Sequence, residues 1–154
     1  SHEVVRTLMK ELVNSMQKIV LDIQDERNRN KDKLYVDKAF EEKNARHKSK
    51  NLSKSLSIIY GLQTSLDFDK AMEIANSLFQ LYEYCRQEII KGFSQKIEDG
   101  IVKAIGAIRN RKWIKRTIAV SKFTVIGIAA AMKTCAGSDT NTTVAPATVI
   151  AAVI

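Results

Sequence analysis

Few side chains in this sequence have both the type and the spacing that catalysis requires. The two histidines, His2 and His47, belong to neither an HExxH motif nor a Cys/His cluster. The two cysteines, Cys85 and Cys135, lack the spacing of a metal site or of a disulfide framework. The sequence also lacks a GxGxxG motif, a Walker loop and a GxSxG elbow. These features predict a protein that is not an enzyme and that uses no cofactor or metal.

Two acids, Asp67 and Asp69, form a close carboxylate pair. They lie between two apolar stripes, where a carboxylate can accept hydrogen bonds from the first free amides of a helix. We therefore expect Asp67 or Asp69 to cap a helix that begins near residue 68.

The cysteines and the first residues of the chain indicate in which cellular compartment the protein is expected. Cys85 belongs to a helical apolar pattern, where a free buried thiol is the usual state. Free thiols suit a reducing compartment, and the first residues show no signal-peptide pattern. We expect a cytoplasmic protein.

Four stretches carry apolar residues at three- and four-residue steps, the pattern of amphipathic helices. They cover about residues 3–24, about 51–66, about 68–91, and about 94 through Ile108 toward Trp113. Six glycines and a single proline, Pro146, leave these stretches almost uninterrupted. Turns at residues 66–68 and 91–94, the second with Gly92 as a left-handed cap, connect them. The pattern predicts an all-α antiparallel four-helix bundle, followed by a fifth short helix or a disordered apolar C-terminal tail.

The predicted bundle domain covers residues 1–116 and includes a very polar stretch at residues 25–50. Charges of both signs alternate there, which favours a solvated helix extension plus a loop. A nucleic-acid-binding arm is the alternative, but the many acids oppose phosphate binding, which needs net positive charge.

The tail, residues 117–154, is rich in Ala, Val, Ile and Thr. Its two apolar stretches are shorter than the about 20 residues that a membrane-spanning helix needs. Three interpretations stay open. The tail is a disordered extension, a plug for the bundle's own groove, or a fused segment that resembles a client.

The net charge of +8 is concentrated in the last third of the chain. Residues 1–99 hold 17 Lys and Arg against 16 Asp and Glu, whereas residues 100–154 hold eight against one. A basic helical module that binds an anionic membrane surface or nucleic acid is therefore an alternative function. The cations behind it are Lys103, Arg109, Arg111, Lys112, Lys115, Arg116 and Lys122.

The third helical stretch also holds a group of aromatic residues, Phe79, Tyr82 and Tyr84. Aromatic side chains at helical spacing usually pack a core or an interface. Residues two apart on a helix cannot face the same way. We therefore expect one of Tyr82 and Tyr84 to face the core and the other to face water or a partner.

The stretch LDFDKAMEIANSLFQLYEY, residues 66–84, resembles a signature of the FliS family of flagellar export chaperones. Residues 2–24 and 51–114 are similar to the rest of that family's helices. The chain departs from the family pattern at Ala71 and Met72, where Gly-Gly is usual, and in the tail after about Thr117.

This resemblance implies a cytosolic chaperone that binds the disordered C-terminal segment of flagellin, prevents premature polymerisation and aids flagellar type III export. Other components of the export machinery are further candidate partners. Such a client folds as it docks in grooves between helices. The candidate contact residues lie on the second and third helical stretches: Ile58, Tyr60, Gln63, Met72, Asn76, Phe79 and Tyr84.

Overall fold

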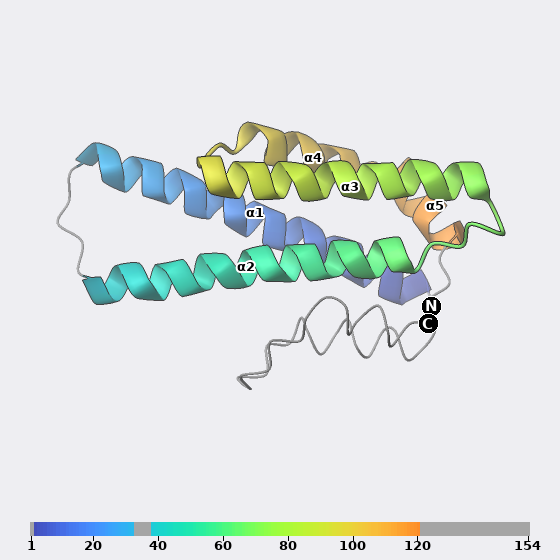
Figure 1. The fold of residues 1–154 in the computed structure, drawn as a ribbon, viewed down its shortest axis with the longest axis horizontal. Coiled ribbons are helices and arrows are strands. Elements are labelled where there is room, and N and C mark those ends of the chain that lie inside the picture. Colours follow the sequence, from blue (N-terminus) through green and yellow to red (C-terminus); the bar gives the residue numbers. More distant parts are fainter. Residues whose placement is uncertain (1, 33–37, 121–154) are drawn as a thin grey trace.

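The computed structural model describes residues 2–32 and 38–120, which form five helices. They are α1 (His2–Asp32), α2 (Lys38–Thr64), α3 (Met72–Gln95), α4 (Asp99–Arg109) and α5 (Arg111–Val120). The first four run antiparallel to their neighbours, and α4 returns to lie against α1 (Figure 1). The prediction of an all-α antiparallel bundle is confirmed, and a fifth short helix, one of the two predicted alternatives, is present.

The core consists of the apolar stripes that the helical spacing indicated. Leu12, Met16 and Ile19 of α1 are completely or almost completely buried, as are Ile59 of α2 and Leu78 of α3. Burying side chains of this size stabilises a fold by about 1.5–3 kcal/mol each before the entropy of ordering them is subtracted. Burial of these periodic apolar residues therefore explains why the helices pack into a bundle.

One buried polar contact joins α3 to α5. The Tyr82 hydroxyl lies 2.7 Å from Thr117 Oγ1, and Thr117 Oγ1 in turn donates to the Trp113 carbonyl at 2.9 Å. Because the single hydroxyl hydrogen of Thr117 is used in the second bond, Tyr82 must be the donor in the first. Within the described part of the chain, every buried side-chain nitrogen and oxygen has a partner.

Helix α5 closes the end of the bundle that the short α4 leaves open (Figure 1). It packs against α1, α3 and α4, and it buries Thr117 and Val120. The predicted domain boundary after residue 116 thus falls inside α5. At its end, the Asp67 amide donates to the Val120 carbonyl at 2.8 Å. The three interpretations of the tail concern residues 121–154, which lie outside the described residues.

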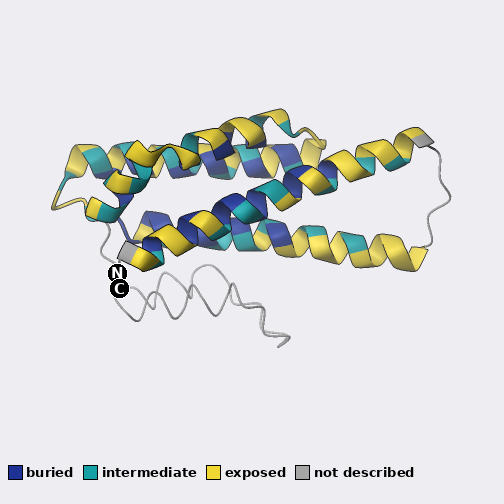
Figure 2. Cartoon of the chain, turned by 180° about the vertical axis from the view of Figure 1, so that it is seen from behind, coloured by how far each residue is buried: buried dark blue, intermediate teal, exposed yellow. Residues whose placement is uncertain are grey.

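The polar stretch at residues 25–50 is mostly helical. Helix α1 continues to Asp32 and α2 already begins at Lys38, so both helices extend beyond the apolar stretches of residues 3–24 and 51–66. The expected solvated helix extension is present, and Figure 2 shows how exposed this end of the bundle is. Glu26 stabilises it by ion pairs with Lys48 at 2.7 Å and Lys96 at 3.3 Å.

The prediction that Gly92 ends the third helix was wrong. Helix α3 continues to Gln95, and Lys96 adopts the left-handed conformation with a φ of 59°. Gly92 is buried instead, and a Cβ atom at this position would lie 2.6 Å from both Ile101 Cδ1 and the Ile97 carbonyl oxygen. The glycine is there because α3 and α4 approach each other closely.

The prediction that Asp67 or Asp69 caps the third helix was also wrong. Helix α3 begins at Met72, after Ala71, without a side-chain cap. Asp67 Oδ1 accepts hydrogen bonds from the amides of Asp69 and Lys70, both at 3.1 Å. The carboxylate therefore shapes the α2–α3 connection instead of the helix end.

Candidate protein-binding surface

A row of accessible side chains runs along α3. Met72, Asn76, Phe79, Glu83 and Arg86 follow one another at steps of four and three residues, so they lie on one side of the helix. All five are exposed or half-buried. This row is separate from the stripe that α3 buries in the core, which includes Ala75, Leu78, Tyr82, Cys85 and Ile89.

The row borders a shallow, open depression of about 530 Å³ between α2 and α3. Six residues line it: Tyr60, Gln63, Thr64, Phe79, Glu83 and Arg86. Gln63 is buried, and its Nε2 atom donates to the Phe79 carbonyl at 3.5 Å, which bridges the two helices. The depression thus lies in the seam between two packed helices.

Two aromatic side chains line this seam, and a third packs against one of them. Tyr60 is 40% exposed and Phe79 is 42% exposed, although both are large apolar groups. Phe68, in the α2–α3 connection, packs against Phe79 with ring centroids 6.4 Å apart and planes tilted by 59°. Among the described residues, Met72 is the most exposed of the large apolar side chains, at 65%. Contiguous exposed apolar surface of this kind marks interaction sites in soluble proteins.

The charged residues of the depression neutralise each other. Arg86 Nε donates to Glu83 Oε2 at 2.9 Å, and a second guanidinium nitrogen donates to Glu83 Oε1. The hydrogen bond from Arg86 is the main cause that lowers the pKa of Glu83 to about 2, with smaller contributions from Gln87 and Gln63. The pKa of Arg86 is raised, chiefly by Glu83. The pair therefore stays ionised and adds little net charge to an apolar seam.

The structure brings five of the predicted contact residues together and separates two. Tyr60, Gln63, Met72, Asn76 and Phe79 all lie along the α2–α3 seam. The other two, Ile58 and Tyr84, do not belong to it.

Ile58 is fully buried and belongs to the core. Tyr84 is exposed, but it follows Phe79 by five residues, which places it about 140° around α3 at about 100° per residue. Tyr82 is fully buried, so the prediction that one of the two tyrosines faces the core and the other faces outward is confirmed.

Four lining or flanking residues were missed from the sequence: Thr64, Phe68, Glu83 and Arg86. The spacing could have identified two of them, because Glu83 and Arg86 continue the row from Phe79 at steps of four and seven. Phe68 was read as the start of a helix, whereas it lies in the connection.

The side chains of this surface offer contacts rather than reactive groups. Among residues 2–32 and 38–120, no group of three or more His, Cys, Asp or Glu side chains is placed to hold a metal ion. Burial raises the pKa of the Cys85 thiol to about 12, so it is a poor nucleophile. In the described part of the chain, no helix is long and apolar enough to cross a membrane.

The family model described as "Flagellar protein FliS" matches residues 1–114, which cover α1 to α4 and the start of α5. No curated protein and no solved structure matches the chain.

Proposed function

The chain belongs to the FliS family of flagellar proteins, and from this premise we propose that it is an export chaperone for flagellin. In this proposal it acts in the cytoplasm. It binds the disordered C-terminal segment of flagellin, prevents premature polymerisation and aids flagellar type III export.

The observation that supports this proposal best is the exposed aromatic seam between α2 and α3. Tyr60 and Phe79 leave more than a third of their surface in water, and Met72 leaves more. A client segment with an apolar face would cover these side chains, and the binding free energy gained is about 25 cal/mol per Å² of buried apolar area. That gain is available to a disordered segment only if it exceeds the entropy of ordering the segment, which favours a long contact.

The row of accessible side chains on α3 has the length of a short helix. From Met72 to Arg86 the row spans 14 residue steps, or about 21 Å of helix axis. A client helix of about four turns has the same length, and it would present apolar residues at i, i+4 and i+7 toward Phe79 and Tyr60. The internally neutralised pair of Glu83 and Arg86 suits a client with little net charge on its docking face.

The test is isothermal titration of the chain with a synthetic peptide of the flagellin C-terminal segment. Phe79→Ala should weaken binding by about 10- to 100-fold, the effect of truncating a central aromatic anchor. Tyr84→Ala is a matched control, because Tyr84 is as exposed as Phe79 but lies outside the seam. It should change the dissociation constant less than about twofold. Circular dichroism establishes that each variant remains folded.

Two results would count against the proposal. Absence of binding by the unchanged chain would refute the flagellin assignment, and an equal loss in both variants would refute the assignment to this seam. Binding that falls steeply with salt would favour the alternative of a basic module for membranes or nucleic acid, since an apolar groove depends far less on salt.

We propose in addition that residues 121–154 compete with the client. The Asp67–Val120 hydrogen bond places the end of α5 at the α2–α3 connection, which carries Phe68. The apolar segment that follows therefore starts at one end of the seam. If it occupies the seam part of the time, it reduces the apparent client affinity by the occupied fraction. A chain that ends at Val120 should bind the peptide more tightly, and an unchanged dissociation constant would reject the plug.

A further inference from the structure

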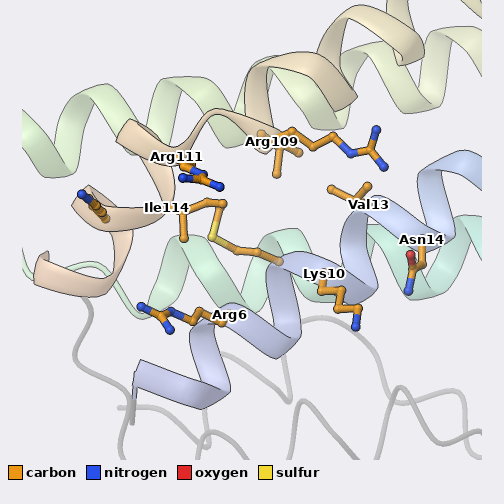
Figure 3. A pocket seen from close by; sticks show the side chains of 10 residues that line it. Arg6, Lys10, Val13, Asn14, Arg109, Arg111 and Ile114 are labelled. Carbon is orange, nitrogen blue, oxygen red and sulfur yellow. The ribbon is translucent and has the colours of Figure 1, made fainter.

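A second concave surface lies between α1, α4 and α5. It is a pocket of about 490 Å³, and Figure 3 shows the side chains that line it. Its floor is apolar and consists of Met9 and Val13 from α1, Ile108 from α4 and Ile114 from α5. Met9, Val13 and Ile108 are buried and Ile114 is half-buried, so this floor is recessed below the protein surface.

Among the residues that the structure describes, the rim of the pocket carries five cations and no acid. Arg6 and Lys10 extend from α1, and Arg109, Arg111 and Lys115 extend from the α4–α5 corner. In Figure 3 the two α1 cations lie along one edge, and Arg109 and Arg111 lie along the opposite edge. Cations held this close repel one another, and an anion between them would relieve that repulsion.

None of the five rim cations forms an ion pair within residues 2–32 and 38–120. Elsewhere in these residues, Arg27, Lys48, Lys54, Arg86 and Lys96 all pair with glutamates. Five cations without an ion pair among these residues therefore surround an apolar floor. A ligand that matches both features carries apolar groups in its centre and carboxylates beside them.

The chain builds this rim through Asn110. Helix α4 ends at Arg109, and Asn110 Oδ1 accepts a hydrogen bond from the Lys112 amide at 3.0 Å. The Asn110 carbonyl also accepts from the Trp113 amide at 3.0 Å. Asn110 thus ends one helix and caps the next, and the resulting corner holds Arg109 and Arg111 on either side of the turn.

We infer that this basic pocket binds an acidic amphipathic helix of a protein partner other than flagellin. The α1 wall runs from Arg6 to Asn14, about 12 Å of helix, which corresponds to a little more than two turns of a bound helix. Apolar side chains one turn apart on that helix would reach the floor. Glutamates on its flanks would meet the cations of the two edges.

Other anionic partners fit the pocket less well. A bilayer surface cannot follow a recessed floor, because the apolar side chains that insert into membranes must protrude. Nucleic acid would use the cations but leave the apolar floor without a contact. Residues 121–154 of this chain hold two lysines and a single acid, Asp139, so they lack the required charge.

The pocket lies on the opposite side of the bundle from the α2–α3 seam. The helices contact each other in the cyclic order α1, α2, α3 and α4, with α1 closing against α4. The α1–α4 edge and the α2–α3 edge are therefore diagonally opposed. A client in the seam and an acidic helix in the pocket can be bound at the same time, and the pocket does not depend on the flagellin assignment.

The test uses the full chain and a fluorescently labelled model peptide of 14 residues with leucines on one face and glutamates beside them. Two further peptides serve as controls: a scrambled sequence of the same composition and a version with lysine in place of glutamate. Fluorescence anisotropy should show saturable binding of the first peptide and at least about tenfold weaker binding of both controls.

Charge reversal locates the site. The double variant Lys10→Glu with Arg111→Glu should weaken binding by at least about tenfold, because two rim contacts become repulsive. The double variant Lys43→Glu with Lys91→Glu has the same net charge, and its exposed lysines lie outside the pocket. It should stay within about twofold of the unchanged chain. Circular dichroism establishes that both variants fold.

Four outcomes would overturn the inference. The first two are equal binding of the scrambled peptide and an equal loss of binding in both double variants. The third is displacement of the labelled peptide by an unlabelled flagellin C-terminal peptide. The fourth is tighter binding of phosphatidylglycerol vesicles or duplex DNA that depends on Lys10 and Arg111. Failure of flagellin to bind at all would leave the pocket assignment untouched, so the two proposals fail separately.

Discussion

Replacing Gly92 by alanine tests the close contact between α3 and α4. An added Cβ would lie 2.6 Å from the Ile97 carbonyl oxygen and 2.6 Å from Ile101 Cδ1. The Ile101 side chain can rotate away, but the Ile97 backbone cannot, since its amide donates to the Gly92 carbonyl at 3.1 Å. Gly106, in the middle of α4, is the matched control, because a Cβ there would have no neighbour within 4 Å.

Helix propensity and the steric cost of the added Cβ determine the expected change in the free energy of unfolding. Both substitutions gain about 0.8–1 kcal/mol of helix propensity, because glycine is the less favourable residue inside a helix. Gly92→Ala also forces a backbone shift in a packed region, which costs about 1–3 kcal/mol. Gly106→Ala should therefore stabilise the bundle by up to about 1 kcal/mol, whereas Gly92→Ala should destabilise it by up to about 2 kcal/mol.

Urea unfolding followed by circular dichroism measures both changes. The difference in the free energy of unfolding between the two variants isolates the steric term, provided that their m-values agree. If Gly92→Ala stabilises the protein as much as Gly106→Ala, α3 and α4 do not approach as described. The account of why a glycine occupies this helix position would then be wrong.

Three further substitutions or titrations probe buried and paired groups. Tyr82→Phe removes the buried hydrogen bond to α5 and should lower the free energy of unfolding by about 1 kcal/mol in the same urea assay. In a Cys135→Ser background, the Cys85 thiol should resist maleimide at neutral pH until the chain is unfolded, because its pKa is about 12; rapid labelling of the folded chain would contradict its burial. Glu83 should titrate near pH 2 by NMR and return toward its ordinary 4.5 in Arg86→Gln. Since the folded-state pKa is lowered, this pair should stabilise the fold above pH 4.5 and lose that contribution as the pH falls through about 2; an unchanged pKa in the variant would contradict the pairing.

The fold could be predicted from the sequence because helical periodicity alone selects the buried stripes. The helix ends could not. Gly92 looks like a cap because glycine tolerates left-handed backbone, yet Lys96 adopts that conformation and Gly92 serves a contact with α4. Asp67 looks like a cap because a carboxylate can accept hydrogen bonds from the first amides of a helix, but α3 begins five residues later. The preference of a single residue for a helix end is weak here, and contacts between distant segments decide where the helices begin and end.

The apolar pattern also gave the wrong start for α2, for a different reason. Buried residues of α2 begin at Asn51, whereas the helix begins at Lys38. The pattern therefore marks where the helix enters the core rather than where it starts. The polar turns before Asn51 lie beside α1, and the ion pair between Lys48 and Glu26 supports them. A helix without a buried face leaves no periodic signal.

The contact residues illustrate the same limit. Ile58, Ile59 and Tyr60 are consecutive and all apolar, so the sequence could not tell which of them faces the core. The structure buries the two isoleucines and exposes Tyr60. On α3, by contrast, Glu83 stands between Tyr82 and Tyr84, and the prediction that these two tyrosines face different sides is confirmed. The sequence is therefore informative where a polar residue separates two large side chains, and uninformative where the apolar run is continuous.

The basic pocket depends on a contact that sequence order conceals. The excess of positive charge in the last third of the chain was apparent, but Arg6 and Lys10 lie about 100 residues before Arg109 and Arg111. Only the antiparallel return of α4 along α1 brings the two groups to opposite edges of one pocket. Because α4 is short and the chain turns at Asn110, the floor between them is not covered by a longer helix. The same turn places α5 where Thr117 can accept the Tyr82 hydrogen bond, so the corner that stabilises the end of the bundle also creates its basic recess.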